Sequence, residues 1–197
     1  MRDYPAIALI ELSSIASGIA TSDSMVKRAP VALLKTGTVS KGRFLILIGG
    51  IVAAVEEAHA EGLSVGASSV LDSVVLPDVH AQVHDAIQGA RRPCSGDGIA
   101  VCETMNVSST IRSADAAIKG AKVEIVEMRL ADALGGKAFV VYTGRVEDLL
   151  VATEIARDSA QTPVEIIVVP ILHDAVTQQM EASTRFNGPG RWRMPSP

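Results

Sequence analysis

The stretch IELSSIASGIATSDSMVKRAPV (10–31) decides the fold of this chain, because CETMNVSSTIRSADAAIKGAKV (102–123) repeats its pattern 92 positions later. Matched positions carry the same residue: Glu11 and Glu103, Ser17 and Ser109, Ile19 and Ile111, Asp23 and Asp115, Lys27 and Lys119, Val31 and Val123. An ordered correspondence of this length indicates a tandem duplication.

The correspondence continues along the whole chain. Two more pairs of segments align: KGRFLILIGGIV (41–52) with GGKAFVVYTGRV (135–146), and VVLPDVHAQV (74–83) with IVVPILHDAV (167–176). Two copies are too few for a solenoid, which needs at least about three repeats. The sequence therefore predicts two like-folded domains, residues 5–90 and 98–183, joined around QGARRPCSGDG (88–98) and followed by a flexible tail, residues 184–197.

The bulk composition excludes several classes of protein. Hydrophobic residues make up 48% of the 197 residues and charged residues 20%, which is typical of a globular protein. The net charge of -4 gives no general attraction to nucleic acid or to an anionic membrane. Charges at Arg2, Asp3 and Glu11 leave the N-terminal apolar run too short for a signal peptide. The longest apolar stretch without charge, residues 44–55, is too short to span a bilayer as a helix. We therefore expect a cytoplasmic protein.

Each copy predicts the same order of elements. A strand (6–12) leads to a helix for which the Ser13–Ser14 pair, or Asn106 in the second copy, is a plausible N-cap. Helical spacing is kept by Ile15, Ile19, Ser22, Val26 and Ala29, and by Val107, Ile111, Ala114, Ile118 and Ala121. Two strands (31–35 and 44–48), a helix (51–61, or 145–159 in the second copy), a last strand and a short helix follow. This β-α-β-β-α-β order predicts a ferredoxin-like α/β (α+β) fold, an antiparallel sheet with helices on one face.

The residue types that most often carry chemistry do not form a catalytic pattern here. His80 and His84 have a spacing that suits one metal ion, but no HExxH motif surrounds them, and a polar helix start is the simpler interpretation. Cys94 and Cys102 are too far apart for a zinc or redox pair, and Cys102 lies in an apolar run that favours a buried, inert thiol. We predict no catalytic residue, no metal site and no cofactor.

Two of the charged positions that are repeated in both copies suggest a role. Glu11 and Glu103 each end a first strand, which favours a hydrogen bond to backbone at the strand–helix joint over an acid–base role that would have to arise twice. Lys27 and Lys119 lie on the following helices, either solvated or laid across a subunit contact.

The repeated motifs resemble the bacterial microcompartment (BMC) shell domain. The resemblance rests on DSMVKRA (23–29) and DAAIKGA (115–121), on PDVH (77–80) and PILH (170–173), and on the glutamate that ends each first strand. It covers residues 6–182. The order of motifs resembles the unpermuted tandem class of propanediol-utilisation compartments.

The resemblance implies a structural protein and not an enzyme. Tandem members form homotrimers that imitate a hexamer and pack, with hexameric and pentameric shell proteins, into a shell that encloses enzymes in the cytoplasm. By the same resemblance, loops 36–42 and 129–136 line a central pore, and Lys27 and Lys119 are tile-edge contacts. The pore residues it implies are Thr38, Val39, Ser40, Lys41 and Gly42.

Two positions depart from the family pattern. Ser40 stands where propanediol-type tandem proteins carry a cysteine that binds an iron–sulfur cluster, and such clusters need thiolate ligands. We therefore expect an open, cluster-free pore in which Lys41 favours anions and polar metabolites. Neither PDVH nor PILH carries the arginine that many shell domains insert into a neighbouring tile.

Two other functions remain open from the sequence. A trimer that carries a redox centre or effector in its pore is the first alternative. The second is an enzyme or small-molecule sensor on duplicated ferredoxin-like domains, which requires a ligand cleft between the domains.

Overall fold

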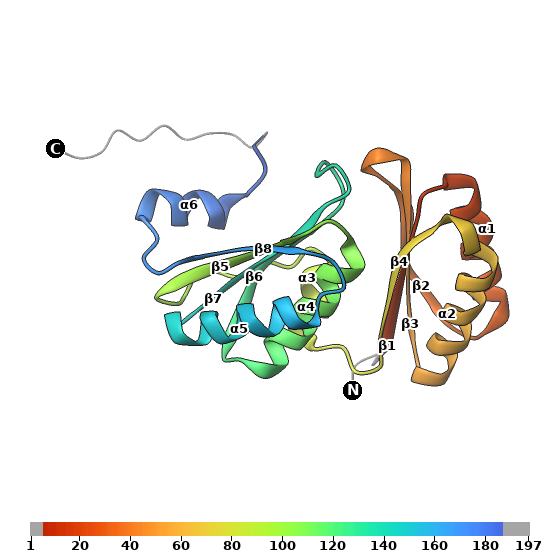
Figure 1. Cartoon of the computed structure of the whole chain (residues 1–197), viewed down its shortest axis with the longest axis horizontal. Helices are drawn as coiled ribbons and strands as arrows, with labels where there is room; N and C mark the ends of the chain where they lie inside the picture. The colour runs from red at the N-terminus through yellow and green to blue at the C-terminus, as the bar shows by residue number, and fades with distance from the viewer. Residues whose placement is uncertain (1–5, 187–197) are drawn as a thin grey trace.

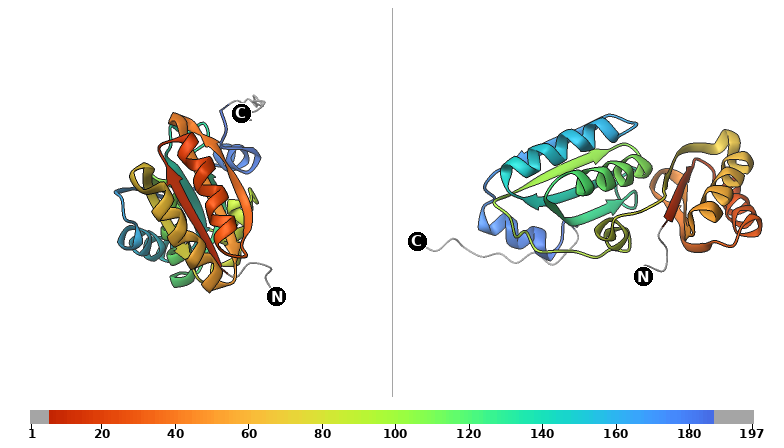
Figure 2. Two further views of the ribbon diagram at one scale, coloured as in Figure 1. Left: turned by 90° about the vertical axis from the view of Figure 1, so that its right-hand side faces the viewer. Right: turned by 90° about the horizontal axis from the view of Figure 1, so that it is seen from below.

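The computed structural model describes residues 6–186 as two α/β units side by side (Figures 1 and 2). The expected flexible tail lies outside the described residues from residue 187 onward. The elements of the first unit are β1 (Ala6–Leu12), α1 (Ile15–Arg28), β2 (Ala32–Val39), β3 (Arg43–Gly50), α2 (Val52–Gly66), β4 (Val70–Leu76) and α3 (Ala81–Ile87). Those of the second are β5 (Gly98–Thr104), α4 (Val107–Gly120), β6 (Val123–Leu130), β7 (Ala138–Gly144), α5 (Val146–Ser159), β8 (Val164–Val169) and α6 (Asp174–Ala182).

Both units have the predicted topology. The sheet orders are β2-β3-β1-β4 and β6-β7-β5-β8, and every pair is antiparallel. Helices α1 and α2 cover one face of the first sheet, and α4 and α5 cover one face of the second (Figure 1). The ferredoxin-like α/β prediction is confirmed in both copies.

Alternation along β1 divides its side chains between two cores. Ala8, Ile10 and Leu12 face α1 and α2 and belong to the first unit's own core. Ile7 and Leu9 face the second unit and join a core that continues through α4. All residues of β1 are buried, so both faces of this strand are covered within one chain.

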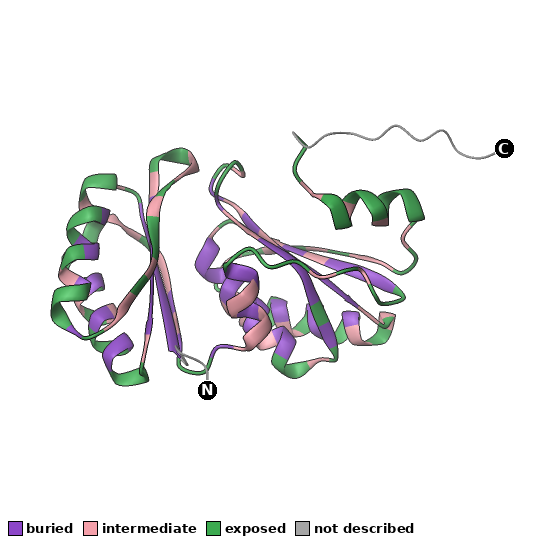
Figure 3. Ribbon diagram, turned by 180° about the vertical axis from the view of Figure 1, so that it is seen from behind, coloured by how far each residue is buried: buried purple, intermediate pink, exposed green. Residues whose placement is uncertain are grey.

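The second core crosses the domain boundary. Helix α4 packs against its own sheet and also against β1 and β4 of the first unit, while α3 packs against β6. Most residues of α4 are buried, and Figure 3 shows buried segments of the second unit on the side that faces the first. Burying a Leu, Ile or Val side chain contributes about 1.5–3 kcal/mol, so this shared core holds the two units together.

Some element boundaries differ from those expected. The helix expected over 51–61 begins at Val52 and continues to Gly66. Its last turns lie very close to the sheet, since a Cβ on Gly62 would be 2.6 Å from Cδ1 of Ile10. Glycine is unfavourable in a helix by local propensity, but the close packing here requires the small size of Gly62 and Gly66.

Candidate functional site

The first of the two turns that the family resemblance places at a pore is shorter than the expected residues 36–42. Thr36 to Val39 belong to β2, and Thr38 pairs with Phe44 of β3. Only Ser40, Lys41 and Gly42 form the turn, which ends the hairpin at the same end of the molecule as the β6–β7 turn (Figure 1). Lys41 and Gly42 both have left-handed backbone, with φ of 65° and 66°, and this tight reversal presents the Lys41 side chain to solvent.

The second turn, residues 131–137, lies beside the first. The expected loop began at Arg129, but β6 continues to Leu130. The Ala131 N–H donates to the Lys137 carbonyl at 3.0 Å and closes the turn. A Cβ on Gly135 would lie 3.6 Å from Cε of Lys41, so the two turns form one continuous rim.

A small cavity of about 220 Å³ lies between the units near this rim. It is lined by Leu9, Leu45 and Leu47 of the first sheet, by Ile87 of α3 and by Asp132 of the second turn, among others. Ligand pockets for small molecules usually measure about 300–1,000 Å³. This cavity does not support the ligand cleft that a sensor or enzyme would require.

Glu11 joins the two units. Its Oε1 accepts a hydrogen bond of 2.6 Å from the N–H of Ser108, in the first turn of α4. The sequence predicted a backbone bond at Glu11's own strand–helix joint; the bond exists, but its donor belongs to the other domain. The carboxylate caps a helix start, where a negative charge is favourable.

The environment of Glu11 changes its protonation. Burial raises the pKa of its carboxyl to about 7, against the lowering effects of the Ser108 hydrogen bond and of Arg43. Nη1 of Arg43 is 3.6 Å from Oε2 of Glu11, too far for a hydrogen bond, and Oε2 accepts none. The guanidinium instead donates to the Met105 and Gly136 carbonyls at 3.3 and 3.2 Å.

Asn106 occupies the predicted N-cap position of α4 without capping it. Its amide nitrogen donates to Asp72 of β4, and its oxygen accepts from Arg43, both at 3.4 Å. In the first copy Ser14 caps α1 as expected, accepting from the Ser17 N–H at 3.2 Å. The difference arises because Glu11 reaches α4, while in the second copy Glu103 pairs with Lys137 at 2.5 Å.

The repeated lysines occupy the last turns of α1 and α4. Lys27 pairs with Asp23, and Lys119 with Asp115, both at 2.5 Å. Lys119 also donates to the carbonyl of Asp78, across the domain boundary. Both ammonium groups remain partly exposed at helix ends, where a positive charge is favourable.

His80 and Cys102 have structural environments. Nδ1 of His80 accepts from the Gln82 N–H at 3.2 Å and caps α3, as the polar-helix-start interpretation predicted. Within residues 6–186, no three His, Cys, Asp or Glu side chains gather as a metal site would need. Cys102 is fully buried, and burial raises the pKa of its thiol to about 12, which makes it inert.

Equivalent apolar stripes on α1 and α4 differ in burial. The stripe on α4 is buried and consists of Val107, Ile111 and Ile118. The equivalent stripe on α1 is exposed and consists of Ile15, Ile19 and Val26. Ile19 is 60% exposed, whereas Ile111 is 0% exposed. The sequence pattern predicted both stripes but had no signal to distinguish a covered one from an uncovered one.

The open faces of the two sheets show the opposite asymmetry. Val74 of β4 is 3% exposed because α4 covers it, whereas its equivalent Ile167 of β8 is 60% exposed. Two apolar surfaces therefore remain exposed, the α1 stripe on one unit and the part of the β8 face around Ile167 on the other.

Comparison with known proteins agrees with this architecture. The BMC domain family matches residues 6–79 and 98–172. The bacterial microcompartment shell protein PduT of Citrobacter freundii is 37% identical over 178 residues, 89% of this chain and 97% of that protein. Among residues 6–186, no helix is long and apolar enough to cross a bilayer.

Solved structures show the same relationship. A microcompartment protein from Desulfitobacterium hafniense DCB superposes with a TM-score of 0.78 at 37% identity, covering 88% of this chain and 98% of that chain. The fused permuted hexameric shell protein of the RMM microcompartment shares the fold, with a TM-score of 0.58 at 21% identity over 78% of this chain and 83% of its own. This chain, with its two BMC domains in tandem, therefore belongs to the shell proteins of bacterial microcompartments, a structural and non-enzymatic family whose members assemble with one another into the shell.

Proposed function

We propose that this chain forms a homotrimeric tile of the shell facet, with six domains around a central pore. The observation that carries the proposal is the uncovered α1 stripe, whose equivalent on α4 is buried by the neighbouring domain. Within one chain, the open face of the first sheet meets α4. The same contact between the open β8 face of one chain and α1 of the next would cover both exposed surfaces.

This contact is heterologous and repeats around a ring or along a filament. A ring of six like domains satisfies every open face and every stripe. Each chain supplies one such contact internally, so three chains complete the ring. The family resemblance implies the same number.

The pore rim consists of the two adjacent turns. Ser40 and Lys41 come from the first turn and exposed Asp132 from the second, so positive and negative charges alternate around the axis. The carboxylate offsets the preference for anions that Lys41 alone would produce. We therefore propose passage of small polar substrates or products, through a pore with no thiolate to hold a cluster.

Tile edges meet other shell proteins, hexamers and pentamers, and the inner face meets the enclosed enzymes. Lys27 and Lys119 support an edge position because both lie at helix ends and remain partly exposed.

Native mass spectrometry with metal analysis of the same sample tests this function. A mass of three chains without iron or sulfide is the expected result. A trimer that contains a cluster would replace the open pore with the redox-carrier alternative. A monomer or dimer at micromolar concentration would overturn the tile.

A further inference from the structure

Helix α6 has a structural counterpart in α3, yet the two helices lie in different environments. We propose that in the assembled ring α6 packs in trans, on the helix-covered side of β2 in the next chain. This inference rests on the trimer proposed above. It goes further, because it names a segment that crosses between chains and the strip that receives it.

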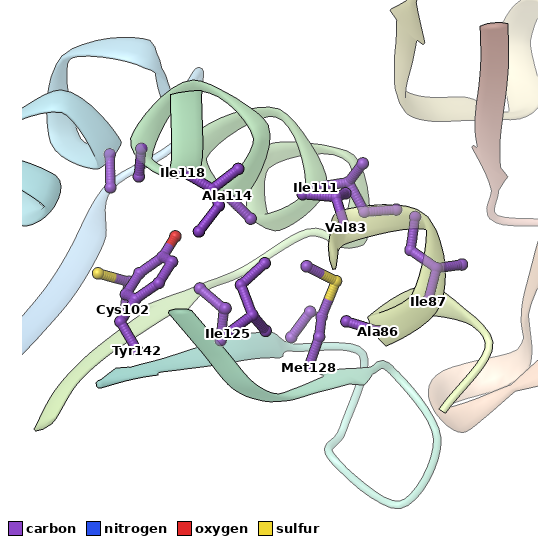
Figure 4. Close-up of a cluster of buried hydrophobic side chains, with 14 of the residues drawn as sticks. Val83, Ala86, Ile87, Cys102, Ile111, Ala114, Ile118, Ile125, Met128 and Tyr142 are labelled. Atoms are coloured by element: carbon purple, nitrogen blue, oxygen red, sulfur yellow. The ribbon is translucent and has the colours of Figure 1, made fainter. Parts of the chain in front are cut away.

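The two helices begin in the same way. Nδ1 of His80 accepts from the Gln82 N–H, and Nδ1 of His173 accepts from the Ala175 N–H, both at 3.2 Å. Their burial then differs. On α3, Val83, Ala86 and Ile87 are buried against the second unit (Figure 4), whereas no residue of α6 is buried.

The side chains of α6 nevertheless suit the same contact. Val176 and Met180 stand at the positions of Val83 and Ile87, one helical turn apart and on one face. Val176 is exposed in this structure. Helix α6 therefore has a small apolar face on which Val176 is exposed and Met180 is only partly buried against its own domain.

The strip that would receive α6, Leu33 and Thr36 of β2, is exposed in the single chain. Helix α3 contacts β6 in the same chain, where Ile125 is 1% exposed and Met128 is buried. The equivalent residues of β2 are Leu33, which is 42% exposed, and Thr36, which is also exposed. Helix and strip each lack the partner that their counterparts have within the chain.

The polar contact at the start of α3 also has an equivalent pair of residues in the other copy. The His80 N–H donates to Oδ1 of Asp115 at 2.7 Å, which ties the start of α3 to α4. Asp23 is the equivalent of Asp115, and its carboxylate is more than half exposed on α1. In trans, the His173 N–H of one chain would donate to Asp23 of the next.

In the single chain, α6 lies on the opposite face of its own sheet from α4 and α5 (Figure 1). Met180 contacts the cluster of Ile99, Val126 and Val141, and Oε1 of Glu181 accepts from the Cys94 N–H at 3.2 Å. This is the face on which α1 of the next chain would dock. We infer that α6 leaves it during assembly.

Disulfide trapping tests the exchange. Gln82 Oε1 accepts from the Ile125 N–H at 2.9 Å, so the equivalent pair in trans is Ala175 and Leu33, both exposed. The test variant is Leu33→Cys with Ala175→Cys in a Cys94→Ser background, oxidised with diamide. The matched control, Ile125→Cys with Gln82→Cys, reports the same contact within one chain.

The expected result is non-reducing gel bands at two and three chain masses for the test variant, and a mobility shift without mass increase for the control. An equimolar mixture of the two single variants should give only a two-chain band, which shows that the link joins different chains. A native trimer without interchain links, beside a linked control, would overturn the exchange and leave the tile intact. If native mass spectrometry shows no trimer, the tile and the exchange both fail.

Discussion

The Glu11 carboxylate is buried between the domains and bonded to the Ser108 N–H, so its protonation state is linked to folding. Its pKa is about 7 in the folded chain, above the ordinary value of 4.5. The folded state thus binds more protons between these values. The contribution of the protonated Glu11 carboxyl to the free energy of unfolding is complete below pH 4.5 and is lost as pH rises through 7.

We predict that Glu11→Gln removes this dependence. The amide keeps an acceptor for Ser108 but does not ionise. The wild type should lose up to about 3 kcal/mol relative to the variant between pH 4.5 and 7.5, since one pKa unit corresponds to about 1.4 kcal/mol. Urea unfolding of both proteins at several pH values measures the difference. A difference that stays constant across this range would contradict the assignment.

Gly18 illustrates a size exchange between the two copies. A Cβ on Gly18 would lie 2.3 Å from Cδ1 of Phe44. At the equivalent positions the second copy has Thr110 and Ala138, a larger helix residue opposite a smaller strand residue.

Gly18→Ala should therefore destabilise the first unit by about 1–3 kcal/mol, because overpacking outweighs a gain in helix propensity of about 0.5–1 kcal/mol. In a Phe44→Ala background the clash disappears, and the same substitution should become stabilising by the propensity alone. A double-mutant cycle by chemical denaturation measures this change of sign. Equal effects in both backgrounds would mean that Phe44 does not limit the space.

At the scale of elements, α1 and α4 have nearly the same pattern but different surroundings. Helical periodicity predicted both helices, and the structure places them on equivalent faces of their sheets. Periodicity alone did not reveal that each helix has two apolar faces, one for its own sheet and one for a neighbouring sheet.

Ile19→Asp should leave the monomer folded, because an exposed substitution changes stability by only about 0.5 kcal/mol. It should abolish the trimer, because a charge would then be buried against the next chain. Val65→Asp on α2 is the control, since Val65 is also exposed and α5, the equivalent of α2, packs on its own unit and not on the first sheet. Native mass spectrometry and circular dichroism report assembly and folding. Trimers of normal mass in Ile19→Asp would exclude this interface.

At the scale of the whole molecule, tile-to-tile packing is separable from trimer formation. Lys27→Ala with Lys119→Ala should abolish lateral sheets, because the proposed edge contacts lose their ammonium groups. The trimer should remain, because the ion pairs lost with Asp23 and Asp115 are partly exposed and each contributes about 1 kcal/mol or less. Lys35→Ala serves as the control, because Lys35 is also an exposed lysine but lies on β2. Electron microscopy of concentrated protein detects the sheets. A double variant that forms normal sheets would show that these lysines are not edge contacts.

The sequence by itself determined the duplication, the order of strands and helices and the family resemblance, because these depend on local periodicity and repeated motifs. The tertiary structure decided the length of the β2–β3 and β6–β7 turns, the partner of Glu11 and which apolar stripe is covered. Two copies with one pattern carry the same surfaces, so the pattern cannot say which surface meets the other copy. The linker, residues 88–97, connects α3 to β5, and in the folded chain the first sheet meets α4, while the α1 stripe and Ile167 of β8 stay exposed on different units.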